Sequence, residues 1–199
     1  MKLHLSSGTV YLTDSGWLNV DVPGPRVWLA SERPDLVARY STTSDDYYGR
    51  HREFDRLEAF RRGPEQSEYL ADVYGRWDCI PARDGSVSEL LARQSFEHLS
   101  LTDTYRALEE VRRVLQAGGV LRLSVPDHDA TLHAFMETRD TVLLRHLLGP
   151  RNSPNGYHLM SYGRASLDAL VTSHGFAPGE DEPSPHAYPS ICMRWRLAA

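Results

Sequence analysis

Four polar residues at the end of one predicted strand, residues 88–94, have the types needed for chemistry. They are Arg93, Gln94, Glu97 and His98. The arginine can hold an anionic substrate group, and either Glu97 or His98 can accept a proton from a nucleophile. The glutamate and the histidine can instead anchor the loop to the backbone, so the pattern alone leaves both roles open.

A second polar segment lies further along the chain, where a predicted helix ends in a loop rich in Pro, Asn and Gly. It is denser in cationic and aromatic side chains than a solvated turn requires. We therefore predict a pocket that binds a phosphate, a carboxylate or a sugar, and packing within the loop is the alternative. The residues are Arg145, His146, Arg151, Tyr157 and His158, with Tyr162 just beyond them.

The elements around the first polar segment predict a βαβ unit. The strand at 88–94 is followed by apolar residues at helical spacing over 105–115 and by an apolar strand at 120–125. Thr102 is the predicted N-cap of the helix, and Gly118-Gly119 suits its C-terminal end. The two strands should therefore be parallel, and ligands of such sheets bind beyond the carboxyl ends of the strands.

A cluster of acids and histidines follows the second strand of this unit. Asp127, Asp129, His128 and His133 are residue types that bind divalent metal ions. No standard ligand spacing such as HExxH occurs among them, so we predict no metal site. Asp127 or Asp129 should instead cap a helix that runs from 130 to about 138.

The start of the chain predicts two more strands of the sheet, at residues 2–5 and 17–22. Only residues 6–16 connect them. A parallel crossover normally needs about a dozen residues or more. We therefore expect the usual crossover helix to be reduced to a turn or to be missing.

Residues 26–76 are longer and more polar than a simple crossover requires. We predict an insertion at about 40–65, containing an amphipathic helix at 51–62, and a third strand at 69–74. The insertion can be a substrate lid, because long loops in compact domains often close over active sites. A dimerisation arm or a surface decoration is the alternative.

The pattern around the βαβ unit resembles a known family. Glu97-His98-Leu99, Arg112-Arg113-Val114-Leu115, Ala117-Gly118-Gly119 and Ser124-Val125-Pro126-Asp127 are similar to "EHL…RVLkPGG…lrisvPD". That series is typical of class I S-adenosylmethionine-dependent methyltransferases with a Rossmann-like fold. The sequence departs from it at Gln116-Ala117, where the family usually has Lys-Pro. The resemblance covers nearly the whole chain apart from residues 26–70.

The resemblance implies where S-adenosylmethionine would bind. The family loop after the first strand wraps the methionine part of the cofactor, and Ser6-Ser7-Gly8 stands there in place of Gly-x-Gly. Asp21 matches the acid that binds the ribose hydroxyls. Asp78 matches the acid near the adenine, although Asp72 is an equally good candidate. Gln94, at the end of the fourth strand, is also assigned to the cofactor site.

The resemblance also implies an α/β fold with a Rossmann-like methyltransferase sheet and helices on both faces. The sheet should be mostly parallel, with the C-terminal strand at about 190–197 as an antiparallel edge strand. A helix at 166–175 should precede that strand. We expect one domain over residues 1–199.

Composition narrows the function classes. The net charge of −5 is evidence against a general nucleic-acid or membrane-surface binder. Cys79 and Cys192 are too few for a disulfide framework or a cysteine zinc site. The N-terminus is too polar for a signal peptide and no apolar run is long enough to span a membrane, so we expect a cytoplasmic protein.

These observations predict methyl transfer from S-adenosylmethionine to a small polar or anionic metabolite, such as a sugar, a nucleotide or a natural-product intermediate. The alternative is a protein that keeps the fold but acts as a binding or regulatory subunit, or runs other chemistry in the same cleft. Ser6 and the short first crossover favour the alternative, whereas Asp21 and the βαβ motifs favour the enzyme. The sequence leaves a homodimer open.

Overall fold

The computed structural model describes residues 1–47, 68–149 and 156–198. Most of the predicted insertion at 40–65 lies outside these ranges, as do its predicted helix at 51–62 and Arg151. Within the described residues, no helix is long and apolar enough to cross a membrane.

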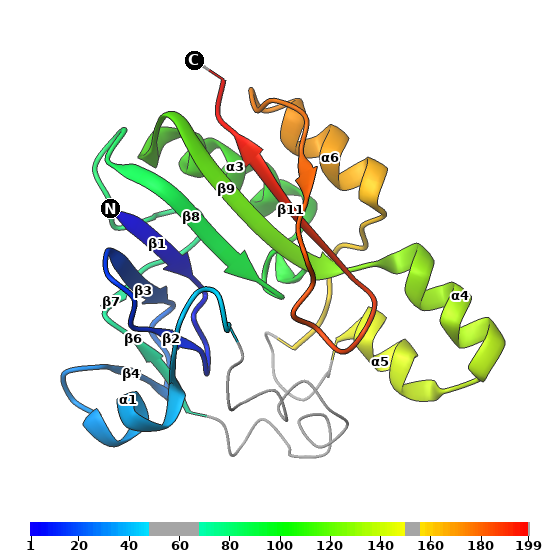
Figure 1. Cartoon of the computed structure of the whole chain (residues 1–199), viewed down its shortest axis with the longest axis horizontal. Coiled ribbons are helices and arrows are strands. Elements are labelled where there is room, and N and C mark those ends of the chain that lie inside the picture. The colour runs from blue at the N-terminus through cyan, green and yellow to red at the C-terminus, as the bar shows by residue number, and fades with distance from the viewer. Residues whose placement is uncertain (48–67, 150–155, 199) are drawn as a thin grey trace.

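A twisted seven-stranded sheet organises the chain (Figure 1), in the order β10-β11-β9-β8-β1-β3-β7. The strands β7, β3, β1, β8 and β9 run parallel, whereas β11 and β10 are antiparallel to their neighbours. This confirms the predicted mostly parallel sheet with an antiparallel C-terminal strand. The strand bounds are Lys2–Leu5 for β1, Trp17–Asp21 for β3, Val73–Tyr74 for β7, Val87–Arg93 for β8, Leu115–Pro126 for β9, Glu180–Asp181 for β10 and Ser190–Arg196 for β11.

We predicted that the C-terminal strand would be the edge of the sheet, and this is wrong for β11. The two-residue strand β10 pairs outside it, with Glu180 opposite Arg194 and Asp181 opposite Met193. Such a short, charged outer strand protects the edge of a sheet against pairing with another chain. Its two acidic residues gave no strand pattern in the sequence, which is why the prediction missed it.

The predicted strand at 69–74 is divided into two. β6 (Tyr69–Ala71) pairs with β4 (Val27–Leu29) in a small separate sheet, whereas β7 joins β3 of the main sheet. Asp72 lies between the two strands. Its amide donates to Asn19 O at 2.7 Å, so the chain changes partner at this residue.

Further short elements lie near the N-terminal half of the sheet. β2 (Tyr11–Leu12) pairs with β5 (Ser41–Thr42), and α1 (Pro34–Tyr40) packs against the small β4–β6 sheet. β2 is the only regular element between β1 and β3. This confirms that the first crossover contains no long helix.

Two helices, α3 (Leu101–Val114) and α6 (Arg164–Thr172), cover one face of the sheet. Their apolar residues join those of β1, β8, β9 and β11 in the main core, where Leu108, Leu121 and Leu167 are fully buried. The helices α4 (His128–Thr138) and α5 (Thr141–Leu148) extend past the carboxyl end of β9 (Figure 1).

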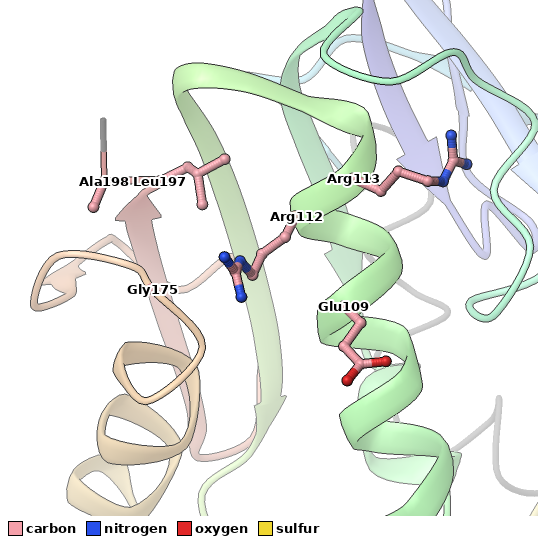
Figure 2. Close-up of a pocket in the computed structure, with 6 residues that line it drawn as sticks. All are labelled: Glu109, Arg112, Arg113, Gly175, Leu197 and Ala198. Carbon is pink, nitrogen blue, oxygen red and sulfur yellow. The ribbon is translucent and has the colours of Figure 1, made fainter.

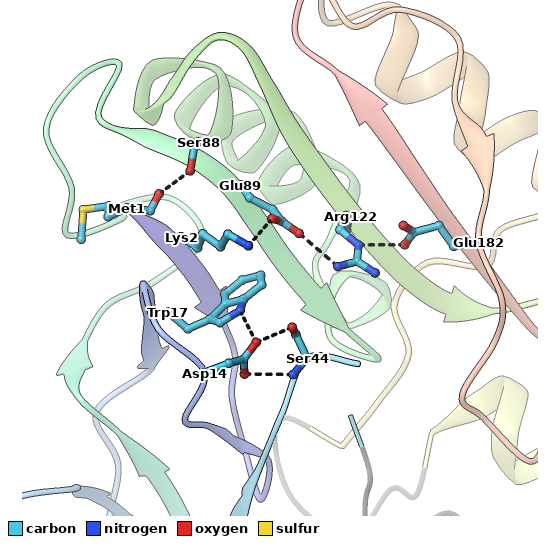
Figure 3. Close-up of polar contacts among 9 residues, drawn as sticks. All are labelled: Met1, Lys2, Asp14, Trp17, Ser44, Ser88, Glu89, Arg122 and Glu182. Carbon is cyan, nitrogen blue, oxygen red and sulfur yellow. Dashed lines mark hydrogen bonds and ion pairs between the residues drawn. The ribbon is translucent and has the colours of Figure 1, made fainter. Parts of the chain in front are cut away.

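The opposite face of the sheet is largely polar. A ladder of alternating charge crosses it (Figure 3): Glu89 lies 3.1 Å from Lys2 and 3.0 Å from Arg122, and Arg122 lies 2.9 Å from Glu182. We expected a helical layer here, but the described residues place β2 and the segment ending at Tyr47 on this face. An eleven-residue connection cannot hold a crossover helix, and charged side chains favour a hydrated surface over helix packing.

The ends of α3 differ from those predicted. Ser100 is the N-cap, because its side chain accepts a hydrogen bond from Asp103 N at 3.2 Å, whereas Thr102 lies inside the first turn and is exposed. The helix ends at Val114, since Leu115 is already extended and pairs with Val87. Gly118 and Gly119 therefore belong to the start of β9 instead of the helix end.

Two matched substitutions test this cap. Ser100→Ala should lower the free energy of unfolding by about 1 kcal/mol, because it removes the acceptor for a helix amide. Thr102→Ala should change it by less than about 0.5 kcal/mol, since this exposed side chain has no capping role. Urea denaturation of the two variants and the wild type measures the difference. Equal effects, or a larger effect at Thr102, would contradict the assignment.

Candidate active site

The chain reverses its direction of travel across the sheet between β1 and β8. From β1 it continues to β3 and β7 on one side, and later from β8 to β9 and β11 on the other. Such a reversal leaves a crevice beyond the carboxyl ends of the two central strands, which is where open α/β sheets bind ligands. Ser6 and Gln94 follow these ends, with backbone φ angles of +58° and +51°.

The loop after β1 adopts the turn for which glycine is usual. Ser6 and Gly8 both have left-handed φ angles, of +58° and +56°. A residue other than glycine pays about 1–2 kcal/mol for this conformation, so Ser6 is strained. The hydroxyl of Ser7 is buried and donates to Leu70 O at 2.7 Å, so this side chain holds the loop to β6. Beside Gly8 the space is open, because an added Cβ would meet nothing closer than 3.9 Å.

Asp21 ends β3 directly beside this loop. Its carboxylate accepts hydrogen bonds from Gly8 N at 2.7 Å and from Val22 N at 2.8 Å. Burial raises the pKa of Asp21, and the two amide donors partly offset this effect. Each oxygen keeps a free lone pair, so the carboxylate can still accept hydroxyl donors.

The two candidate acids for the adenine side have different surroundings. Asp72 accepts hydrogen bonds from Asn19 N at 2.7 Å and from the Tyr11 hydroxyl at 2.5 Å, so it joins β2 to β3. Asp78 lies in the turn after β7 and pairs with Arg76 at 2.8 Å. Because Asp72 is already engaged in holding strands together, Asp78 is the better candidate of the two.

Gln94 points away from the loop after β1. Its side-chain amide donates to the hydroxyl of Ser190, on β11, at 3.4 Å, and its backbone amide donates to Ser124 O at 2.8 Å. The side chain therefore faces the side of the crevice formed by β9 and β11, and its contact with the cofactor stays a prediction.

Arg93 is a buried cation at the carboxyl end of β8, with 8 % of its surface exposed. Its guanidinium lies 4.9 Å from the centre of the Tyr47 ring, and Nη1 lies 3.8 Å from Cys192 Sγ. Among the described residues it pairs with no carboxylate, and its Nε has no hydrogen-bond partner. A buried charge without a partner is costly, so this arginine is suited to bind an anionic group.

A buried hydrogen-bond network positions Tyr47 over Arg93. The Tyr47 hydroxyl donates to His4 Nε2 at 2.7 Å, because His4 Nδ1 donates to the amide oxygen of Asn19 at 3.0 Å. Asp14 fixes the chain just before Tyr47, since it accepts hydrogen bonds from Ser44 N at 3.0 Å and from the Trp17 indole (Figure 3).

Three more side chains near Arg93 were not predicted from the sequence. Ser124 stands opposite Arg93 on β9, Cys192 stands opposite Ser124 on β11, and the Ser124 hydroxyl lies 2.8 Å from His186 Nε2. Burial, followed by the charges of Arg93 and His146, lowers the pKa of His186 to about 3. Strand register alone would place Ser124 and Cys192 here, whereas His186 lies in a proline-rich segment without any pattern.

A second group of polar side chains contains Glu97 and His98 from the first predicted segment and His158 from the second. His98 Nδ1 donates to Tyr157 O at 2.9 Å, and the rings of His98 and His158 are 4.7 Å apart. Glu97 is buried, and its carboxyl oxygen lies 3.8 Å from His158 Nε2. In this tautomer Nε2 of His98 carries a lone pair, so His98 stays a candidate proton acceptor.

The other polar residues of the second segment do not form one cluster. His146 is buried, and its Nε2 donates to Pro189 O at 3.0 Å. Arg145 is exposed on α5, and the Tyr157 side chain is 47 % exposed. The dense polar set of the sequence therefore divides between the buried histidines and the surface.

A hollow of about 480 Å³ lies at the opposite edge of the sheet. Figure 2 shows Arg112 there, between α3 and the turn at Gly175, with Arg113 directed away from it. Leu197 follows β11, which is antiparallel, so this end lies at the amino edge of the parallel strands. The hollow is therefore separate from the crevice and carries none of the predicted site residues.

Known proteins share sequence and fold features with this chain. Residues 43–123 match a family model described as a methyltransferase domain. No curated protein matches the sequence. Several solved methyltransferase structures share the fold across the whole chain.

One similar structure is a chain of the complex between the Haloferax volcanii Trm112 methyltransferase activator and a methyltransferase, with 15 % identity and a TM-score of 0.55. It is matched over 100 % of this chain and 82 % of its own. A SAM-dependent methyltransferase from Thermotoga maritima has 14 % identity and a TM-score of 0.50, over 98 % and 81 % of the two chains. Magnesium protoporphyrin IX methyltransferase from Synechocystis, with bound S-adenosylhomocysteine, has 10 % identity and a TM-score of 0.50, over 100 % and 74 %.

The chain as a whole has the fold of class I, S-adenosylmethionine-dependent methyltransferases, and its residues 43–123 match a methyltransferase domain.

The matched residues 43–123 contain β8, α3 and most of β9. It therefore includes Arg93, Gln94, Glu97 and His98. The loop after β1 and Asp21 lie before it. Their place in the methyltransferase fold comes from the sheet topology and not from the sequence match.

The buried His4 makes the stability of the fold depend on pH. Burial lowers the pKa of His4 from 6.5 to about 4. Between these values the unfolded chain binds a proton at this residue and the folded chain does not. The free energy of unfolding should therefore fall as the pH decreases through this window, by up to about 1.4 kcal/mol per pH unit from this residue.

His4→Gln should reduce that slope between pH 6.5 and 4.5, as measured by urea denaturation at several pH values. His133→Gln is the matched control, because the side chain of His133 is 78 % exposed and changes its surroundings little on folding. If the wild type and His4→Gln show the same slope, the charge state assigned to the buried network is wrong.

Proposed function

We propose that this protein transfers a methyl group from S-adenosylmethionine to a small metabolite that carries an anionic group. The observation that carries the proposal is the buried Arg93 at the switch point, which has no carboxylate partner among the described residues and lies across from Asp21 and the Gly8 loop. One side of the crevice is suited to a cofactor and the other to an anion. A sugar phosphate, a nucleotide or a carboxylated intermediate has this chemistry.

The residues after β1 and β3 fit the cofactor that the fold implies. Gly8 leaves open space at a left-handed turn, and Asp21 presents a carboxylate that two backbone amides orient. The loop 6–8 would hold the amino-acid end, Asp21 would hold the ribose hydroxyls and Asp78 would lie on the adenine side. When bound, S-adenosylmethionine supplies an electrophilic methyl group, so the protein mainly has to position the nucleophile.

The surroundings of Arg93 favour an anionic substrate over a neutral one. Tyr47, Cys192 and the neutral His186 give the guanidinium no counter-charge. A bound phosphate or carboxylate would supply that charge and accept from the free Nε. The ion pair between this anion and Arg93 would offset part of the free energy lost when the arginine is buried.

Tyr47 supports a lid role for the predicted insertion at 40–65. Tyr47 lies within the first part of the predicted insertion, and its ring and hydroxyl contact Arg93 and His4 inside the site. A dimerisation arm would have no need of this contact. We therefore assign the start of the insertion to the substrate site.

Asp21→Ala should weaken the binding of S-adenosylmethionine. Loss of hydrogen bonds to a charged acceptor costs about 1.5–3 kcal/mol each, which is about 10-fold to 150-fold in affinity. Isothermal titration calorimetry with S-adenosylmethionine and S-adenosylhomocysteine measures it. Ser6→Gly is the control, because it relaxes the left-handed turn and should retain binding.

Unchanged affinity in Asp21→Ala would remove this residue from the cofactor site. Wild-type protein that is folded, free of copurified cofactor and unable to bind either compound would overturn the proposed activity. That result would favour a binding or regulatory protein that keeps the fold.

Arg93→Met should stabilise the protein, unlike most substitutions of buried residues. It removes a buried charge that has no counter-ion among the residues the structure describes and keeps an extended apolar side chain, so the free energy of unfolding should rise by about 1 kcal/mol or more. Inorganic phosphate should raise the melting temperature of the wild type and have less effect on the variant. Arg83→Met, at an exposed residue, is the control and should change neither quantity appreciably. A large loss of stability in Arg93→Met would show that the guanidinium is structural.

A further inference from the structure

Glu97, His98 and His158 bring three potential metal-ligand atoms to one place. One carboxylate oxygen and one nitrogen from each imidazole lie within 4.8 Å of one another. Glu97 and His98 belong to the short helix η3 (Phe96–His98), whereas His158 follows α5 in the chain. The amides of Leu159 and Met160 donate to Glu97 O at 2.9 and 3.1 Å, so the backbone holds the two segments together.

The buried carboxyl group of Glu97 makes no hydrogen bond to any described residue. The residue is 1 % exposed, and among the described residues neither of its oxygens has a hydrogen-bond partner. His158 Nε2 lies 3.8 Å from Glu97 Oε1 and is therefore beyond hydrogen-bond distance. Buried polar groups are nearly always satisfied in proteins, so an unsatisfied carboxyl directed at two imidazoles requires an explanation.

Both imidazoles are oriented as metal-binding histidines are. His98 Nδ1 donates to Tyr157 O at 2.9 Å, and His158 Nδ1 donates to Leu147 O at 3.1 Å. A carbonyl oxygen can only accept, so each ring carries its proton on Nδ1 and a lone pair on Nε2. A backbone carbonyl that fixes the tautomer in this way is the usual outer partner of a histidine ligand.

We propose that Glu97, His98 and His158 bind a divalent transition-metal ion of the Zn²⁺ type. Two imidazoles and one carboxylate form the three-ligand set of zinc sites that keep a fourth position open. Tetrahedral ligand atoms would stand about 3.4 Å apart, given metal–ligand distances of about 2.0–2.1 Å. The carboxyl of Glu97 can move closer to the rings without breaking a hydrogen bond, since its oxygens have none among the described residues.

The nature of the ligands selects against Mg²⁺ and Ca²⁺, which prefer oxygen ligands, and favours ions that accept imidazole nitrogen. His98 is partly exposed, whereas the side chain of His158 is only 8 % exposed, so an ion would reach the site past His98. In this role His98 is a ligand and not the proton acceptor. If the proposed methyl transfer holds, the open position would bind and acidify a substrate hydroxyl, and this last step alone rests on the proposed function.

Metal binding is tested on the full chain without S-adenosylmethionine or substrate, so the outcome is independent of methyl transfer. Protein stripped with a chelator is titrated with Zn²⁺ in competition with a chromophoric chelator, with and without excess Mg²⁺. We expect one equivalent of Zn²⁺ to bind the wild type, and Mg²⁺ not to displace it. Glu97→Gln and His158→Gln should each weaken binding by more than about 100-fold, which exceeds the loss typical of outer-shell changes.

His133→Gln is the matched control for binding at a surface histidine. His133 lies 3.2 Å from Glu137 on the exposed side of α4, a pair that could hold Zn²⁺ weakly. This variant should bind as the wild type does. If it loses the Zn²⁺ equivalent while Glu97→Gln keeps it, the ion binds at the surface and the proposal is wrong.

A spectroscopic measurement on the wild type makes the test independent of how the variants fold. Co²⁺ in place of Zn²⁺ should give the visible absorption of a four-coordinate site, and Zn²⁺ should remove it. Absence of stoichiometric Zn²⁺ binding by the folded wild type, or a Co²⁺ spectrum equal to that of the hydrated ion, would overturn the proposal.

Discussion

The parallel pairing of β1 with β8 is the constraint on which the site depends. Leu3 lies opposite Leu90 and His4 opposite Leu91, so the two strands end together at the carboxyl edge of the sheet. Because the chain leaves β1 and β8 in opposite directions, the loop at Ser6–Gly8 and the residues after Arg93 open on a common crevice. Both loops begin with a left-handed residue, which turns the backbone sharply away from its strand.

One face of the sheet is packed in the core, and the other carries charged side chains. Leu90 and Ala92 point into the core under α3 and α6, whereas Glu89, Leu91 and Arg93 alternate onto the other face. Alternation along a strand allows one short segment to supply both the packing that holds the sheet and the charges that face the ligand. The polar face ends in the buried cation Arg93, which gives the carboxyl edge its electrostatic character.

Much of the fold could be predicted from the sequence, because its signals are local. Apolar spacing located α3, and the strands on both sides of it followed from their apolar runs. The short segment at 6–16 correctly excluded a crossover helix. Errors occurred where a local signal had competitors: Ser100 and Thr102 are both good caps, and only the direction of the chain before α3 selects Ser100. The outer strand β10 has no apolar pattern to detect.

The candidate site was predicted less completely, for a physical reason. A site is a set of contacts between segments that are distant in the chain, and propensities do not encode those contacts. The grouping of Glu97 with His158 depends on a backbone connection from Leu159 to η3, and the environment of Arg93 depends on Tyr47 and His186. By itself the sequence determined which residue types stand at the ends of the strands, because strand periodicity and the family motifs depend only on residues that are close together in the chain. Only the tertiary structure decided which of them are buried together, because burial and hydrogen bonding are properties of the packed chain.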